Sequence, residues 1–499
     1  MKTAAVAFSL STIASAALTP AVRAAAHRFG ALDHALSSRK VHGKPVPRLG
    51  GLAIVAAFYV PLLALLDVDS SVGQRFWGDR LHAFGLIGGS LVIAGLGVYD
   101  DLRGAGARLK FAVQFGAAAL MYAVGFRIDQ VAIPFGPVVQ LGPLGPFLTL
   151  FWIVGVINAL NLIDGLDGLA GGVAFVAAAV TFVQAALHGD PLMLLFTGAL
   201  AGAVLGFLVY NFNPASIFMG DTGSMFLGFV LAVSAIQTNQ KSSACVALAV
   251  PIVLLGVPIC DTLLAIGRRA ARGAPLFSAD REHIHHRLLD LGLSQREAVL
   301  AIYGVAVLLG LAALELGRVS GLAAAGFLGG LAVTVLLLLR RLGYLRLGKL
   351  GRTLVRRRRN LAMRQSVRAA AERLRAAADP SEVFGCLLDP CQALGARCLS
   401  LELDDPGRPA RWSTGFTGCA FRARFPIFGE RGGGGTLELG WDRGRRTLDR
   451  DTEIAVEQLC GEVRGALVRL ERSDSVVGFR ARRQASGGHA DDVRMAGRR

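Results

Sequence analysis

The residues best suited to chemistry are aspartates at the ends of apolar stretches. Asp100 and Asp101 close one stretch. Asp164 and Asp167 close another, and Asp221 stands just before a third. An aspartate at the centre of a bilayer costs roughly 2.5–3.5 kcal/mol on insertion scales, and a place at the end of a span avoids most of that cost. Solvation alone does not call for carboxylates from several separate loops, so the surrounding motifs must decide their role.

Two segments surround these aspartates with residues that break helices and bind hard cations. One begins at Asn158 and reads NALNLIDGLDGLAGG, and the other begins at Asn211 and reads NFNPASIFMGDTGS. Their glycines permit positive φ and close approach of the backbone. Their carboxylate and amide oxygens are ligands of the kind that Mg²⁺ takes. For Asp221 the alternative is a cap of the following helix, a place that Asn would fill almost equally well.

A third segment combines cationic and imidazole side chains. It begins at Arg268 and reads RRAARGAPLFSADREHIHHRL. Arginine and histidine at this density suit an anionic diphosphate. Three histidines also suggest zinc, but the spacing of His283, His285 and His286 is tight for one ion on a helix, and no cysteine is near. The pattern therefore favours the anion.

The composition predicts a membrane protein. Of the 499 residues, 53% are hydrophobic and only 18% are charged, against about 25% in an ordinary soluble protein. A span needs about 20 apolar residues, so we expect an all-α polytopic fold with about 10–11 transmembrane helices. For the first candidate a cleaved signal peptide is the alternative to a retained span. The eleven candidates are 3–22, 50–67, 82–99, 111–126, 146–162, 169–187, 191–210, 222–238, 244–266, 297–316 and 320–340.

The distribution of basic residues predicts the orientation of the spans. Lys and Arg number fifteen in the loops 23–49, 100–110, 211–221 and 267–296, and five in the loops of the opposite side. Short loops rich in Lys and Arg stay in the cytoplasm. We therefore expect the aspartate motifs and the C-terminal tail to face the cytoplasm.

The seven cysteines form no metal or disulfide pattern. Their number is odd and no CxxC pair occurs, so neither a zinc site nor a disulfide framework is indicated. Two lie in apolar segments and five in the tail, where we expect reduced thiols. The seven are Cys245, Cys260, Cys386, Cys391, Cys398, Cys419 and Cys460.

The chain changes character after residue 345. A basic linker or helix is expected over 346–376, and its run from Arg356 to Arg359 favours a stop signal facing anionic lipid over a nucleic-acid patch. Residues 377–473 read as helix, strand, hairpin strands and helix, which predicts a small cytoplasmic α+β domain with a weak resemblance to GAF-type sensors. A scaffold or dimerisation module is favoured over a live sensor, so a homodimer is an open expectation. Residues 474–499 are polar and are expected to be disordered.

In their order along the chain, these motifs resemble the polyprenyl-phosphate N-acetylhexosamine-1-phosphate transferases of glycosyltransferase family 4. The likeness covers about residues 35–340 and includes KVHGKPVPRLGG from Lys40 and the closing DREHIHHRL. The HIHH form resembles the branch that uses UDP-GlcNAc, the undecaprenyl-phosphate GlcNAc-1-phosphate transferases. The resemblance implies that residues 1–345 form a Mg²⁺-dependent phosphotransferase of a bacterial inner membrane, with Mn²⁺ as an alternative metal. Its implied partners are UDP-N-acetylhexosamine, undecaprenyl phosphate and membrane lipids, with no nucleic acid.

The resemblance also implies roles for individual positions. Some match catalytic residues, some match metal ligands, and others match contacts to the substrates. The catalytic positions are Asp100, Asp101 and Lys110, and the metal positions are Asn161 and Asp221. The nucleotide positions are Asp164 and Asp167, the sugar-diphosphate positions are Arg281, His283, His285 and His286, and the lipid-phosphate positions are Lys44 and Arg48.

The implied reaction is attack of a lipid phosphate oxygen on the β-phosphorus of the UDP-sugar, with UMP as the leaving group. The product would start a cell-envelope polysaccharide such as an O-antigen. Asp100 would be the base, but a phosphomonoester with a second pKa of about 6 is already mostly ionised, so a structural or electrostatic role is equally open. The rival function is a transporter or flippase for lipid-linked sugars, which would place its polar groups near the bilayer midplane and not at one interface.

Overall fold

The computed structural model describes residues 2–33, 46–64, 78–132, 138–240, 249–272, 283–319, 321–341, 344, 350–404, 410–415, 419, 421–428, 434–442 and 448–487. The chain divides into two units. The first consists of residues 1–267 and 279–346, and the second of residues 268–278 and 347–499. Each unit has its own hydrophobic core.

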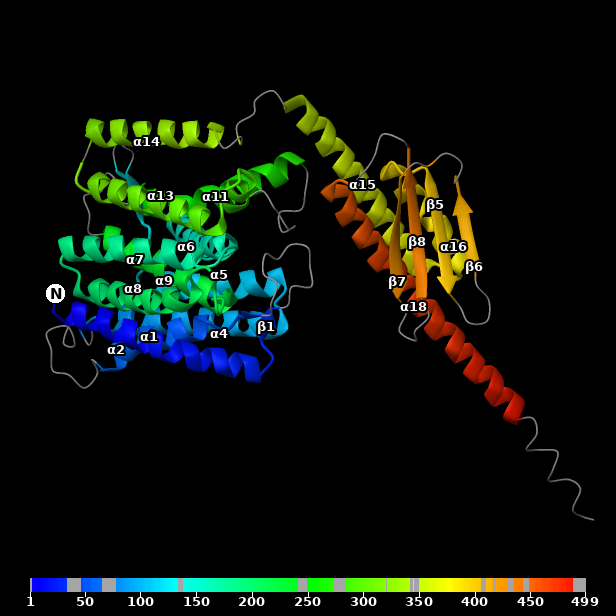
Figure 1. Cartoon of the computed structure of the whole chain (residues 1–499), viewed down its shortest axis with the longest axis horizontal. Coiled ribbons are helices and arrows are strands. Elements are labelled where there is room, and N and C mark those ends of the chain that lie inside the picture. The colour runs from blue at the N-terminus through cyan, green and yellow to red at the C-terminus, as the bar shows by residue number, and fades with distance from the viewer. Residues whose placement is uncertain are drawn as a thin grey trace, which may run out of the picture. The chain divides into compact units, whose positions relative to one another are not determined.

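The first unit is a bundle of apolar helices whose axes run nearly parallel (Figure 1). Among the described residues, seven helices are long and apolar enough to cross a membrane, namely α1, α4, α6, α7, α8, α13 and α14. The expected polytopic all-α fold is therefore confirmed, and each predicted span overlaps a helix among the described residues; the span 244–266 overlaps two. The expected number of about 10–11 transmembrane helices stays a prediction. The helices are α1 (Lys2–Arg28), α2 (Gly51–Ala64), α4 (Arg80–Arg103), α5 (Ala107–Ala123), α6 (Leu144–Ile163), α7 (Leu169–Leu187), α8 (Pro191–Asn211), α9 (Gly220–Gln240), α10 (Ala249–Leu254), α11 (Gly256–Arg272), α13 (Gln295–Leu316) and α14 (Gly321–Arg341).

Local sequence signals fix the starts of two helices in this unit. The Asp190 side chain accepts a hydrogen bond from the backbone N–H of Met193, at 3.1 Å, directly before a proline in the first turn of α8. Ser294 and Glu297 form a reciprocal capping box at the start of α13. These caps satisfy backbone N–H groups that the first turn of a helix leaves unpaired. The described part of the unit also contains the antiparallel pairs β1 (Leu32–Asp33) with β2 (Val46–Pro47) and β3 (Gln130–Ala132) with β4 (Val138–Gln140), and the short helix α12 (Ile284–Asp290).

Helix α1 packs closely against α8 through small residues. A Cβ on Gly202 would lie 2.2 Å from the carbonyl oxygen of Phe8, and one on Gly206 would lie 2.3 Å from that of Thr12. The Tyr210 hydroxyl donates to the carbonyl of Ala16 at 3.1 Å. Small residues allow helix backbones to approach this closely inside a bilayer. Whether α1 is a retained span stays a prediction, and the close approach of α1 to α8 is what the next prediction tests.

We expect Gly202→Ala to lower the thermal stability of the detergent-solubilised protein by about 1–3 kcal/mol, because the new methyl group overpacks the α1–α8 contact. The matched control is Gly155→Ala in α6, where a Cβ meets nothing within 4 Å. There the better helix propensity of alanine should stabilise by up to about 1 kcal/mol. Equal melting temperatures for the two variants would show that α1 is not packed on α8.

The second unit is a small α+β domain, as the sequence predicts. Its four strands are antiparallel and lie in the order β6-β5-β8-β7. Alternate side chains of β5 and β8 pack against the helices, whose buried residues include Val367 of α15 and Leu459 of α18. The elements are α15 (Leu350–Ala376), α16 (Pro380–Cys386), α17 (Leu388–Ala393), β5 (Cys398–Asp404), β6 (Ala410–Thr414), β7 (Phe421–Phe428), β8 (Gly434–Trp441) and α18 (Arg450–Gly487). The segment 346–376, expected as a basic linker or helix, thus supplies core residues through α15, and α18 extends to residue 487.

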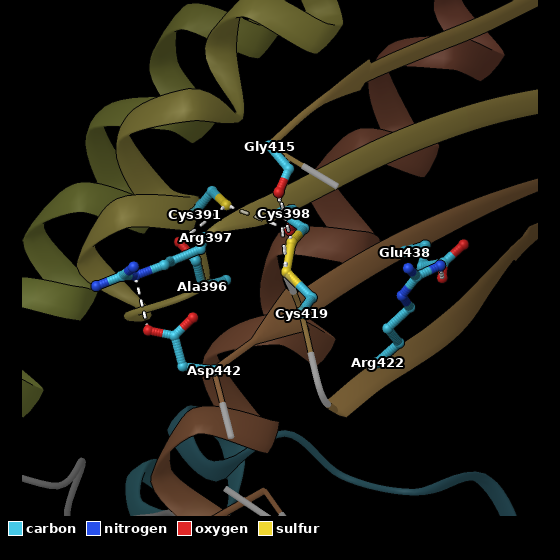
Figure 2. The surroundings of a disulfide bond; sticks show 9 residues. All are labelled: Cys391, Ala396, Arg397, Cys398, Gly415, Cys419, Arg422, Glu438 and Asp442. Atoms are coloured by element: carbon cyan, nitrogen blue, oxygen red, sulfur yellow. Dashed lines mark hydrogen bonds and ion pairs between the residues drawn. A yellow bond between two sulfur atoms is a disulfide. The ribbon is translucent and has the colours of Figure 1, made fainter. Parts of the chain in front are cut away.

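One cysteine pair departs from the sequence expectation. Cys398 of β5 and Cys419, just before β7, form a disulfide across 21 residues (Figure 2). Both cysteines face Gly440 of β8, where a Cβ would lie 3.0 Å from either sulfur atom, so the missing side chain makes room for the pair. The expectation of reduced thiols throughout the tail is wrong at this pair, because spacing along the chain does not reveal which strands become neighbours. Among the described residues, the free cysteines are Cys260, Cys386, Cys391 and Cys460; Cys245 lies outside them.

An ion pair joins Arg359 of α15 to Asp449, directly before α18. This pair should make the stability of the domain depend on pH. Partial burial alone would raise the pKa of Asp449, but hydrogen bonds from Arg359, at 2.7 Å, and Thr452 outweigh it and hold the pKa at about 2. A carboxylate whose pKa is depressed by folding stabilises the folded state above the unfolded pKa of 3.8 and loses that contribution as the pH falls toward 2.

We therefore expect Asp449→Asn to destabilise the domain by about 1 kcal/mol at pH 7, a value reduced by solvent screening of the partly exposed pair. The difference from wild type should vanish near pH 2. Urea unfolding of the full chain, followed by protease susceptibility of the second unit, measures it. Asp442→Asn, which breaks an exposed pair with Arg397, is the control and should have almost no effect. A loss of equal size at pH 7 and pH 2 would contradict the prediction.

Candidate active site

Three helix ends meet around the amino group of Lys110. Lys110 lies in the first turn of α5, and its Nζ contacts Oδ2 of Asp221, in the first turn of α9, at 2.6 Å. The same Nζ forms an ion pair with Asp100, in the last turn of α4. The other oxygen of Asp100 accepts a hydrogen bond from the backbone N–H of Ala105, at 2.5 Å, in the turn between α4 and α5. The predicted catalytic positions Asp100 and Lys110 therefore share one site with Asp221.

Asp101 caps the N-terminus of α9 from another helix. Its carboxylate accepts from the backbone N–H groups of Asp221, at 2.9 Å, and Thr222, at 3.0 Å, and from the Thr222 hydroxyl, at 2.6 Å. These are the N–H groups that a helix start leaves unpaired. The capping role that the sequence left open for Asp221 therefore belongs to Asp101, and the Asp221 side chain is directed to Lys110 instead.

The chain before α2 runs alongside the loop that leads into α9. Phe218 N–H donates to the Pro47 carbonyl at 2.7 Å, and Gly50 N–H donates to the Phe218 carbonyl at 2.9 Å. This pairing brings Arg48 within electrostatic reach of Asp101. Gly220 has φ +71°, and a Cβ there would lie 2.2 Å from the Arg48 carbonyl oxygen, so only glycine fits. The predicted lipid-phosphate position Arg48 thus borders the site, while Lys44 lies outside the described residues.

The loop between α6 and α7 carries two more of the predicted residues. Oδ2 of Asp167 accepts from Nδ2 of Asn213 and from the backbone N–H of Ala215, both at 3.0 Å, so this carboxylate also orders the loop before α9. Burial, and then the charges of Asp221, Asp101 and Asp167, raise the pKa of Asp164 to about 7. Asn161 lies half-buried in the last turn of α6.

The histidine motif packs against the loop between α6 and α7. His283 is buried and its Nδ1 lies 2.8 Å from Oδ2 of Asp261 in α11, whose other oxygen accepts from the backbone N–H of Ile284. A Cβ on Gly165 would lie 2.6 Å from Nε2 of His285. Burial lowers the pKa of His285 to about 3, so this imidazole is neutral at physiological pH. The His286 ring lies beside it at a tilt of 46°, with ring centroids 4.4 Å apart.

Two residues that hold these loops were missed from the sequence. Asp261 anchors the start of α12, and the Tyr303 hydroxyl of α13 donates to the Gly168 carbonyl at 2.5 Å. The sequence signal for Asp261 was a carboxylate within an apolar segment, whereas no feature of the sequence singled out Tyr303. Arg281, the remaining predicted residue of the histidine segment, lies outside the described residues.

The charges of the site fit a divalent cation. Within the part of the chain that the structure describes, no three histidine, cysteine or acidic side chains form a ready-made metal cage. Mg²⁺ does not need one, because it takes one or two carboxylates and completes its shell with water and phosphate oxygens. Among the described residues of the site, the acidic side chains outnumber the cationic ones, and a bound cation would relieve the repulsion between the carboxylates. The acidic residues are Asp100, Asp101, Asp164, Asp167 and Asp221, and the cationic ones are Arg48 and Lys110.

The fold and the site together define a multi-pass membrane protein with a charged site at one end of its helix bundle. The family model of glycosyl transferase family 4 matches residues 83–239 of the chain. A probable undecaprenyl-phosphate N-acetylglucosaminyl 1-phosphate transferase of Bacillus subtilis is 40% identical over 312 residues, which cover 62% of this chain and 84% of that protein. The chain therefore belongs to this family of membrane sugar-phosphate transferases.

Two further relatives carry related names. A decaprenyl-phosphate N-acetylglucosaminephosphotransferase of Mycolicibacterium smegmatis is 34% identical over 56% of this chain and 74% of its own length. An undecaprenyl-phosphate α-N-acetylglucosaminyl 1-phosphate transferase of Salmonella typhi is 29% identical over 58% of this chain and 77% of its own length. In all three the likeness covers less than two thirds of this chain.

Proposed function

We propose that the chain transfers an N-acetylhexosamine-1-phosphate, with GlcNAc-1-phosphate as the first candidate, from a UDP-sugar to undecaprenyl phosphate and releases UMP. The observation that carries this proposal is Lys110, held between Asp100 and Asp221 where α4, α5 and α9 meet. A cation beside carboxylates that suit Mg²⁺ is what a reacting diphosphate requires. The product would then start a cell-envelope polysaccharide.

In this proposal each part of the site has its own task. Asn161 and Asp221 would hold Mg²⁺, or Mn²⁺, which when bound withdraws negative charge from the diphosphate and the departing UMP. Lys110 would exchange a carboxylate for a phosphate oxygen once the substrates are bound. Asp164 and Asp167 would face the nucleotide, and Arg48 would meet the lipid phosphate.

The contacts of Asp100 favour an electrostatic role over that of a base. Both of its oxygens are engaged, one by the Ala105 N–H and the other by Lys110. A lipid phosphate is mostly ionised at pH 7, since the second pKa of a phosphomonoester is about 6. Asp100 would therefore position the Lys110 side chain and keep its amino group protonated, without removing a proton from the lipid phosphate.

The test is UMP release by the purified full chain in detergent, with a panel of UDP-GlcNAc, UDP-GalNAc and UDP-glucose. We expect UMP only when undecaprenyl phosphate is present, and most rapidly with an N-acetylhexosamine donor. Release of UMP without the lipid, or no release with any donor, would overturn the proposal. A transporter or flippase would give the second of these results.

We also propose that the charged end of the bundle and the second unit face the cytoplasm, on the basis of the fifteen and five basic residues on the two sides. Gly106 follows α4 at the site end, and Leu187 ends α7 at the opposite end. In a variant without native cysteines, we expect Leu187→Cys to react with a membrane-impermeant maleimide in whole cells and Gly106→Cys to react only after lysis. The reverse pattern would invert the orientation.

A further inference from the structure

A buried polar cluster lies one helical turn below the proposed catalytic groups. Asn158 Nδ2 donates to Oε1 of Gln114, at 2.7 Å, and to the Val154 carbonyl, at 2.8 Å. Gln114 Nε2 in turn contacts Sδ of Met225 at 3.5 Å. The Gln114 and Met225 side chains are fully buried, and Asn158 is half-buried. The contacts join three helices, α5, α6 and α9.

Each member of this cluster stands directly beneath one group of the site. Gln114 follows Lys110 by four residues on α5, and Met225 follows Asp221 by four residues on α9. Asn158 precedes Asn161 by three residues on α6. Residues three or four apart share one face of a helix, separated by one turn of about 5.4 Å. The helices therefore repeat the arrangement of the site, one turn deeper, with groups that bind one another.

A hydrogen bond between amide side chains restricts the register of two helices more tightly than apolar packing does. Apolar side chains tolerate small slides of one helix along another, whereas a donor and an acceptor pair at one register only, as a single buried Asn does in coiled coils. Leaving either amide unpaired in the bundle is costly. The Gln114–Asn158 bond thus selects the one register of α5 and α6 at which Lys110 and Asn161 stand level.

We propose that Gln114 and Asn158 are positioning residues for sugar-phosphate transfer. They hold α5, α6 and α9 in register so that Lys110, Asn161 and Asp221 converge on the same diphosphate. The inference rests on the proposed function, since it concerns the geometry of that reaction. Neither residue touches the substrates, so their loss should slow the chemical step and leave donor binding almost unchanged.

The test compares Asn158→Leu, Gln114→Met and the double variant with wild type. Supporting groups of this kind typically contribute 10–100-fold to activity, and we expect each single variant to lower kcat by about that factor while the KM for the UDP-sugar changes less than about threefold. The double variant should lose no more than the worse single variant, because both remove one shared bond. It leaves no amide unpaired, so it carries the test if a single variant fails to fold.

The matched control is Tyr59→Phe, which removes another interhelical side-chain hydrogen bond, to Ser90 at 2.6 Å. Ser90 lies ten residues before Asp100, about 15 Å along α4. We expect Tyr59→Phe to lower the melting temperature and leave kcat within about twofold. The inference is overturned if the cluster variants also keep kcat within about twofold, if they raise KM instead, or if the two single losses multiply in the double variant.

Wild-type turnover separates failure of this inference from failure of the proposed function. An active wild type with unchanged variants removes only the positioning role of the cluster. A wild type that releases no UMP removes the reaction that the cluster is inferred to serve, and with it the inference.

Discussion

Asp221→Asn should lower kcat by about 10²–10³-fold while the protein still inserts and folds. The substitution keeps the shape of the side chain but removes the charge that faces Lys110 at 2.6 Å and that would hold Mg²⁺. Loss of one such contact to a developing charge typically costs this factor in rate. The helix start is preserved, because Asp101, not Asp221, caps α9. Initial rates across a Mg²⁺ titration, beside a melting curve, provide the measurement.

Asp190→Asn is the matched control for this prediction. It changes a carboxylate to an amide at the start of α8, where Asn caps about as well as Asp, so its rate should stay within about twofold of wild type. If Asp221→Asn were equally active at every Mg²⁺ concentration, the carboxylate would have no role in the reaction, and the assignment of a metal to it would be wrong.

Lys110→Met should lower kcat by a similar factor, about 10²–10³-fold. Methionine keeps an unbranched chain but removes the only ammonium group that contacts both Asp100 and Asp221 in the described structure. The site would then present facing carboxylates to an anionic diphosphate. Rates at saturating donor and lipid phosphate measure the effect. Arg318→Met, which removes an exposed cation paired with Glu315 at 3.2 Å, should leave the rate unchanged.

A double variant distinguishes two tasks for Lys110. If the amino group only neutralises Asp100, the combination of Lys110→Met with Asp100→Asn should recover activity to within about tenfold of wild type. If Lys110 also contacts the reacting phosphates, as proposed, the double variant should stay as slow as the single one. Recovery would therefore contradict the proposed role of Lys110 while leaving the ion pair itself intact.

The sequence predicted the bundle and the meeting of the aspartates because both follow from patterns along the chain. Apolar segments of span length and their alternating direction place the end of α4 and the starts of α5 and α9 on one side. The same reasoning could not assign Asp101 to the cap of α9, 120 residues away, nor pair His283 with Asp261. Such contacts depend on which helices become neighbours and at what register, and short motifs do not encode that. The Cys398–Cys419 disulfide was missed for the same reason.

The site also reveals differences between the three histidines that the motif alone does not show. The three histidines looked alike as a cationic group, yet His283 is held by a carboxylate and His285 is buried against a glycine of the loop between α6 and α7. Burial lowers the pKa of His285 to about 3, and a neutral imidazole cannot neutralise a phosphate as a charged one does. Only the packing of α12 makes this distinction visible.

The central claim is transfer of a sugar together with its phosphate, and the fate of the β-phosphorus tests it most directly. The full chain would be given UDP-GlcNAc labelled with ³²P at the β-phosphate, together with undecaprenyl phosphate and Mg²⁺, and the products would be partitioned between butanol and water. The account predicts that the label moves into the lipid phase while unlabelled UMP appears in equal amount in the water. Label that stays in the water as UDP, with sugar alone on the lipid, would contradict it.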